Sequence, residues 1–91
     1  MTRGETLQAA SRAVSGDRDR AYGRPEDNFR LIAELWSAYK GTPFTRTDVA
    51  MMMGLLKIAR VRSNPENADS FVDLAGYAAC GAEAAAADKK D

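Results

Sequence analysis

Hydrophobic residues recur along this chain at the three- and four-residue spacing of amphipathic helices, and no stretch alternates as a strand would. The pattern predicts four helices, at about residues 4–14, 25–40, 46–62 and 68–87. The second has the clearest apolar stripe, which is formed by Phe29, Ile32, Ala33, Trp36 and Tyr39. We therefore expect an all-α protein, a compact four-helix domain that spans residues 1–91 and ends in a helical hairpin.

The last two expected helices are separated by a turn signal, Ser63-Asn64-Pro65-Glu66-Asn67, which predicts that one helix folds back on the other. In such a hairpin, residues at equal distances from the turn lie opposite one another, so Lys57 meets Asp73. Charged side chains among apolar ones need partners. We therefore predict an ion pair between these two residues.

The same register predicts further contacts across the hairpin. Arg60 comes near Ser70 and Asp69, and Gly54 meets Gly76. Because a glycine costs about 1 kcal/mol relative to alanine in a helix interior, we expect a compensating close approach of the two backbones where the glycines meet. The alternative is that each glycine is merely tolerated.

Two segments of the hairpin are more hydrophobic than a small domain needs. Residues 49–56 and 71–82 are apolar on nearly every side. Helices of this kind are normally buried all round, and the two other helices of a 91-residue chain cannot cover both. The pattern predicts a homo-oligomer.

Composition narrows the kinds of partner. The 13 basic and 13 acidic residues cancel, whereas a protein that binds duplex nucleic acid usually carries a strongly basic surface. The longest apolar runs are too short to span a bilayer, and the first residues lead into a helix rather than a secretory signal. Cys80 is the only cysteine, so no internal disulfide can form. We expect a cytoplasmic protein that binds neither membrane nor duplex nucleic acid.

The chain has no histidine, which excludes Ser-His-Asp and Cys-His catalysis and every histidine-containing zinc site. Carboxylates offer one alternative chemistry. Asp69 and Asp73 lie one turn apart, and Glu34 and Asp48 would approach from neighbouring helices to hold Mg²⁺ against phosphates. In the simpler interpretation Asp73 pairs with Lys57, Asp48 caps the third helix, and no metal or other cofactor is bound.

Cations and tyrosines predict an anion-binding site instead. One group precedes the second helix, where free backbone N–H groups attract phosphate, and comprises Arg18, Arg20, Tyr22 and Arg24. The other group lies on the hairpin and comprises Lys57, Arg60, Asp73 and Tyr77. The alternatives are a solvated segment neutralised by its own acidic residues, and hairpin cations that pair only with one another's carboxylates.

Five segments, in the same order, resemble those of a family of small uncharacterised bacteriophage and prophage proteins. They are Asp19-Arg20-Ala21-Tyr22-Gly23-Arg24-Pro25, Ile32-Ala33-Glu34-Leu35-Trp36, Asp48-Val49-Ala50-Met51-Met52, Leu56-Lys57-Ile58-Ala59-Arg60 and Asp73-Leu74-Ala75-Gly76-Tyr77-Ala78-Ala79. The resemblance covers residues 17–83.

The Lys-Ile-Ala-Arg and Asp-x-x-Gly-Tyr-Ala pieces are also similar to helical domains associated with phage nucleotide modification. More distantly, they resemble all-α nucleoside triphosphate pyrophosphohydrolases of the MazG type, which hold magnesium with a Glu-x-x-Glu pair and a later Glu-x-x-Asp pair. Here only Asp73 matches the final acid, Ser70 stands in place of its partner, and the second helix has no Glu-x-x-Glu. The resemblance implies a nucleotide-like ligand and does not supply the residues for hydrolysis.

We therefore predict a phage-type small-molecule binding protein that captures a nucleotide-derived ligand, with the sequestration of a host defence signal as one use. The alternative is a magnesium-dependent, MazG-like nucleotide pyrophosphatase of reduced form, with Glu34, Asp48, Asp69 and Asp73 as the metal ligands.

Overall fold

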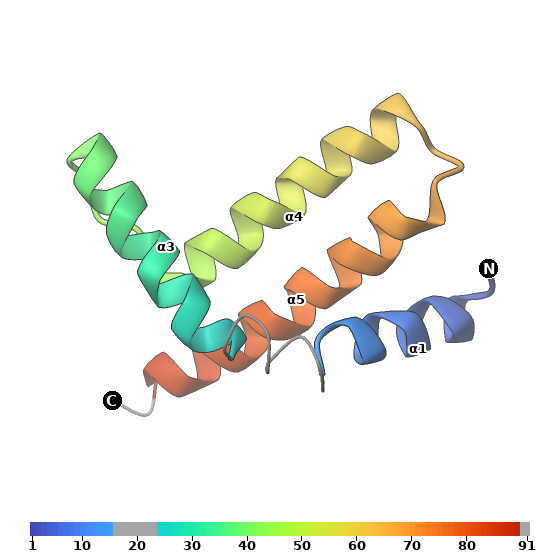
Figure 1. The fold of residues 1–91 in the computed structure, drawn as a ribbon, viewed down its shortest axis with the longest axis horizontal. Helices are drawn as coiled ribbons and strands as arrows, with labels where there is room; N and C mark the ends of the chain where they lie inside the picture. The colour runs from blue at the N-terminus through green and yellow to red at the C-terminus, as the bar shows by residue number, and fades with distance from the viewer. Residues whose placement is uncertain (16–23, 90–91) are drawn as a thin grey trace.

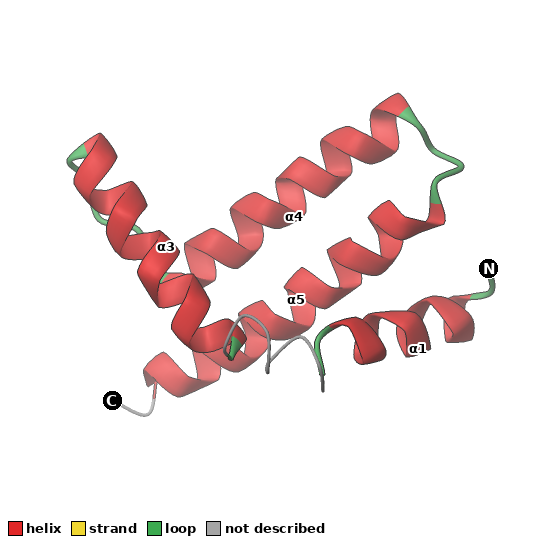
Figure 2. Cartoon of the chain, in the orientation of Figure 1, coloured by secondary structure: helices red, strands yellow, loops and turns green. Residues whose placement is uncertain are grey.

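The computed structural model describes residues 1–15 and 24–89, and these ranges contain four helices and no strand (Figures 1 and 2). The helices are α1 (Arg3–Ala13), α3 (Pro25–Lys40), α4 (Arg46–Ser63) and α5 (Ala68–Lys89). Each helix begins and ends within two residues of its expected range. The predicted all-α fold class is confirmed.

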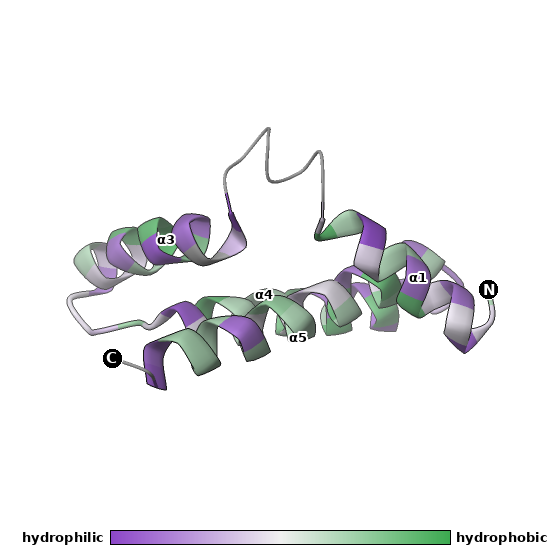
Figure 3. Cartoon of the chain, turned by 90° about the horizontal axis from the view of Figure 1, so that it is seen from below, coloured by the Kyte–Doolittle hydropathy of each residue, from purple (hydrophilic) through white to green (hydrophobic). Residues whose placement is uncertain are grey.

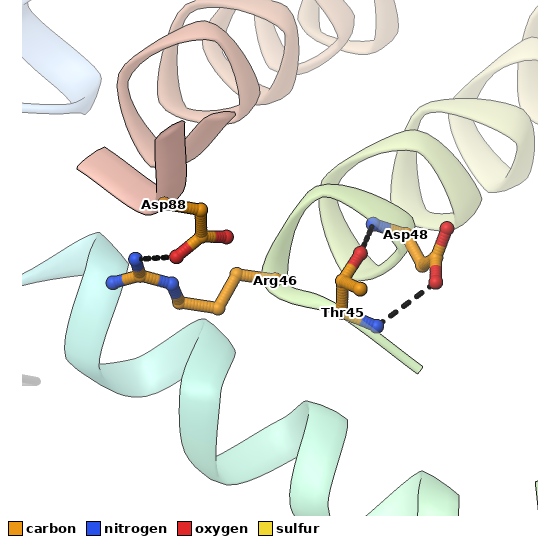
Figure 4. A network of polar contacts seen from close by, with 4 residues as sticks. All are labelled: Thr45, Arg46, Asp48 and Asp88. Carbon is orange, nitrogen blue, oxygen red and sulfur yellow. Dashed lines mark hydrogen bonds and ion pairs between the residues drawn. The ribbon is translucent and has the colours of Figure 1, made fainter. Parts of the chain in front are cut away.

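Two helices begin with a capping box, in which side chains satisfy backbone N–H groups that have no partner within the helix. At α4 the Asp48 N–H donates to Thr45 Oγ1 at 3.0 Å, and the Thr45 N–H donates to Asp48 Oδ2 at 2.9 Å (Figure 4). The expected capping role of Asp48 is thereby confirmed. Thr2 and Glu5 form the same motif at α1, and hydrogen bonding to Thr2, chiefly from its backbone N–H, lowers the pKa of Glu5.

Helix α3 is bounded by residues suited to its two ends. Pro25 occupies the first turn, where its missing N–H has no cost, and Gly41 ends the helix in the left-handed conformation with φ 69°. Ser37 then fixes the connection to α4, because its hydroxyl donates to the Ala33 carbonyl at 2.6 Å and accepts the Phe44 N–H at 2.8 Å.

Helices α4 and α5 form the expected hairpin, with α3 lying across one of its faces and α1 beside α5 (Figures 1 and 3). Helix α3 crosses near the amino end of α4, and α1 runs along α5. The core lies where α3 meets the hairpin, and its buried members are Phe29, Ala33, Val49, Ala50 and Cys80. None of the described helices combines the length and the hydrophobicity needed to cross a membrane.

The hairpin glycines do not meet as expected. A Cβ added to Gly54 would lie 3.3 Å from Leu74 Cδ1, and one added to Gly76 would lie 3.2 Å from Val14 Cγ1. The prediction that these two glycines face each other is therefore wrong. Gly76 is turned toward the carboxyl end of α1, because α5 packs against α1 as well as against α4.

The close approach of α4 and α5 occurs instead at Gly81. A Cβ at this position would lie 3.0 Å from Ala50 Cβ and 3.2 Å from Met51 Cε. Ala50 is completely buried and its Cβ is fixed to the backbone, so only the absence of a side chain at Gly81 allows this spacing.

We expect Gly81→Ala to lower the free energy of unfolding by about 1–2 kcal/mol. The added methyl group overpacks the contact with Ala50, and this cost exceeds the gain in helix propensity from replacing glycine with alanine. Gly54→Ala is the matched control. There the neighbouring atom is the end of a flexible Leu74 side chain, so the free energy of unfolding should stay the same or rise by up to about 1 kcal/mol. Urea unfolding followed by circular dichroism measures both variants. Equal effects would contradict this account of Gly81.

Candidate functional site

A pocket of about 280 Å³ lies where all four described helices come together. We call it the junction pocket. Its polar and aromatic lining comprises Asn28 and Phe29 of α3, Lys57 of α4, and Asp73, Tyr77 and Cys80 of α5. The carboxyl end of α1 adds Ala13 and Val14 to the wall. The pocket therefore depends on the docking of α1 and α3 onto the hairpin.

One ion pair supplies the charge in this pocket. Lys57 Nζ lies 2.9 Å from Asp73 Oδ2, and the two side chains are only 16% and 29% exposed. This is the pair predicted from the hairpin register, and it is confirmed. Asn28 is half-buried in the same lining and adds an amide that can both donate and accept hydrogen bonds.

The pocket also has an aromatic wall. The rings of Phe29 and Tyr77 stack with their centroids 6.2 Å apart and their planes at 30°. Phe29 is buried and Tyr77 is half-buried, so Phe29 backs the wall and Tyr77 retains exposed surface beside the ion pair. A planar molecule in the pocket could pack against this wall while its polar edge meets Lys57 and Asp73.

The predicted phosphate-binding segment is only partly described. Arg18, Arg20 and Tyr22 lie outside the described residues. Arg24 is the exposed N-cap residue of α3 and directly precedes Pro25, which lines the junction pocket.

Arg60 does not join Lys57 in the junction pocket. It lies one turn nearer the hairpin connection and lines a separate surface depression together with Ser70, as the register predicted. No ion pair between Arg60 and Asp69 occurs among the described residues. Asp69 lies in the first turn of α5, where its N–H donates to Asn67 Oδ1 at 3.1 Å.

The four carboxylates considered as magnesium ligands are not gathered. Within residues 1–15 and 24–89, no three or more Asp, Glu or Cys side chains come close enough to hold a metal ion. Asp48 caps α4, Asp73 pairs with Lys57, and Asp69 lies in the first turn of α5 beside the hairpin turn. Glu34 is on α3, which crosses the hairpin at the end away from the turn (Figure 1). The four carboxylates do not come together because this separation keeps Glu34 away from Asp69.

The sequence interpretation missed a second ion pair that joins the two ends of the hairpin. Arg46 at the start of α4 pairs with Asp88 near the end of α5 (Figure 4). Arg46 is buried although it is charged. The two residues are far apart along the chain, and only the hairpin register brings them together. Asn28 and Cys80 were missed for a similar reason, because each is ordinary in its own helix.

The chain belongs to a family of phage proteins. The family model described as "Domain of unknown function (DUF6378)" matches residues 5–85. The chain is 46% identical over 74 residues to the "Gene 55 protein" of Mycobacterium phage D29, which covers 81% of this chain and 49% of that protein. It is 49% identical over 73 residues to the "Gene 55 protein" of Mycobacterium phage L5, with 79% and 47% covered.

The chain thus spans about half the length of these curated relatives. No solved structure matches it significantly. The expected relationship to small bacteriophage proteins is confirmed.

We expect Lys57 and Asp73 to be energetically coupled. Asp73→Leu should lower the free energy of unfolding by about 2–3 kcal/mol, because it leaves a mostly buried ammonium group without its partner. The double change Lys57→Met with Asp73→Leu should recover most of this loss, as measured by urea unfolding.

Arg60→Met is the matched control for that cycle. It removes a cation one turn away that does not line the junction pocket. Its effect should add to that of Asp73→Leu within about 0.5 kcal/mol. If the losses in free energy of unfolding caused by Lys57→Met and Asp73→Leu were also additive in the double variant, the ion pair would contribute nothing to stability.

Proposed function

We propose that the junction pocket binds a small nucleotide-derived molecule and does not hydrolyse it. The observation that carries this proposal is the Lys57–Asp73 ion pair on the wall of the junction pocket, beside the stacked rings of Phe29 and Tyr77. A polar pair next to a flat aromatic surface suits a heterocyclic base, which has a polar edge and two flat faces.

The size of the pocket supports the base as the recognised part. A volume of about 280 Å³ is just below the usual range of small-molecule sites, which runs from about 300 to 1,000 Å³. It suits a base or a nucleoside better than a whole oligonucleotide. The phosphates of such a ligand would then lie at the mouth of the pocket.

The polar groups match a base edge in kind. Lys57 donates hydrogen bonds, Asp73 accepts them, and the amide of Asn28 does both. Because Lys57 and Asp73 neutralise each other, the pocket favours a neutral polar group over a bare anion. This complementarity favours the base inside and the negative charge outside.

The amino end of α3 is suited to that outer charge. Pro25 lines the pocket, and Arg24 precedes it at the N-cap, where the positive end of the helix dipole lies. Arg24 is exposed and carries a guanidinium that suits phosphate oxygens.

The positions of the carboxylates favour capture of the ligand over its hydrolysis. A pyrophosphatase of the MazG type needs several acidic residues around magnesium, and the described part of the chain gathers none in groups of three or more. Asp73 is in the pocket but is paired with Lys57. In a phage-infected cell, a protein that holds a nucleotide intact would sequester it, and a host defence signal is one such target.

Isothermal titration with a panel of nucleosides, nucleoside phosphates and cyclic dinucleotides tests the proposal, with and without magnesium. We expect binding that does not require magnesium. Asn28→Leu should weaken it about tenfold, the equivalent of one lost hydrogen bond of about 1.4 kcal/mol. Tyr77→Leu should weaken it as well, and circular dichroism checks that both variants remain folded.

Tyr39→Leu is the matched control, because Tyr39 is 88% exposed on α3 and does not line the pocket. It should leave the affinity unchanged. Small molecules are then recovered after heat denaturation. Intact ligand supports capture, whereas monophosphate and pyrophosphate in excess of the protein would establish hydrolysis. Binding to none of the panel would overturn the proposal.

A further inference from the structure

Helix α4 carries an exposed apolar face with a charge of opposite sign at each end. We call it the outer face of α4, and it comprises Asp48, Met52, Leu55, Ile58 and Arg62. All five side chains are exposed, and Leu55 at the centre is 63% exposed. A contiguous apolar surface of this kind marks an interaction site more often than a solvated face.

The rest of the described chain does not cover this face. Each helical residue turns by about 100°, so Leu55 points away from the side of α4 that carries Lys57 and meets α5. Helix α1 runs along α5 on the far side from α4, and α3 crosses only near the amino end of α4, so neither helix covers this face (Figure 1).

The two end charges select the partner and its orientation. Asp48 and Arg62 are each seven residues from Leu55, about two helical turns, so they share its face. A two-fold axis through Leu55 places Asp48 of one chain against Arg62 of the other, twice. A parallel arrangement would instead bring Asp48 against Asp48 and Arg62 against Arg62.

We propose that two copies of this chain associate through the outer faces of α4, antiparallel and related by a two-fold axis at Leu55. Met52 of one copy then packs against Ile58 of the other, and the apolar centre is closed at both ends by an ion pair. Asp48 is available for this pair because its capping bond uses Oδ2 and the side chain is exposed. The antiparallel order also sets the positive end of each helix beside the negative end of the other.

Sedimentation equilibrium at micromolar concentration tests the association. The unchanged protein should have twice the chain mass of 9.9 kDa, and Leu55→Glu should reduce it to the mass of one chain. Leu35→Glu is the matched control, because Leu35 is 59% exposed but lies on α3. A single-chain mass for the unchanged protein, or dissociation caused by Leu35→Glu and not by Leu55→Glu, would overturn the proposal.

The charges are tested by reversal on one helix. Arg62→Glu should raise the dissociation constant of the dimer at least about tenfold, because it sets a carboxylate against Asp48 of the other copy. Arg60→Glu reverses a charge two residues away that lies off the outer face, and it should leave the constant within about twofold. Equal effects of the two reversals would remove the argument for the ion pairs.

Oxidative cross-linking tests the orientation, since the natural Cys80 is buried. Leu55→Cys should cross-link to itself. Met52→Cys and Ile58→Cys should each remain uncross-linked alone and should cross-link when the two variants are mixed. Self-linking of Met52→Cys and of Ile58→Cys would establish parallel helices and refute the antiparallel arrangement.

Discussion

The spacing between α4 and α5 is the constraint on which the rest of this structure depends. Ala50 and Gly81 allow the two helices to approach until a single added carbon would overlap. This contact fixes the register, and the register in turn places Lys57 opposite Asp73. The junction pocket is therefore a product of backbone packing, because its charged pair forms only when two small residues have brought the helices together.

Much of this hairpin could be predicted from the sequence, and the reason is electrostatic. Lys57 and Asp73 are unusual in their apolar surroundings, so each identifies the other as its partner. Glycines carry no such information. Gly54 and Gly76 lie at equal distances from the turn, but α5 packs against both α4 and α1, and Gly76 faces Val14 at the end of α1. Gly81 lies in an alanine-rich segment, where a close approach leaves no mark on the hydrophobic pattern.

The site was harder to predict than the fold, because periodicity defines the face of a helix and not the place where that face docks. Asn28 looks like an ordinary polar residue of α3 until the helix is set across the hairpin, where it lines the pocket. The same docking carries Glu34 away from Asp69, which sequence reasoning had grouped together. Arg60 follows Lys57 by one turn, yet that turn moves it out of the pocket.

Helix α1 is attached more weakly than the other walls of the junction pocket, and this has a kinetic consequence. Its only buried residue is Ala10, and Leu7 is mostly exposed. Such an element opens locally at a lower free energy than the molecule unfolds. Since Ala13 and Val14 complete the pocket, an occupant would leave when α1 swings away and the hairpin stays folded. Its residence time would then be set by the lifetime of one helix-to-helix contact.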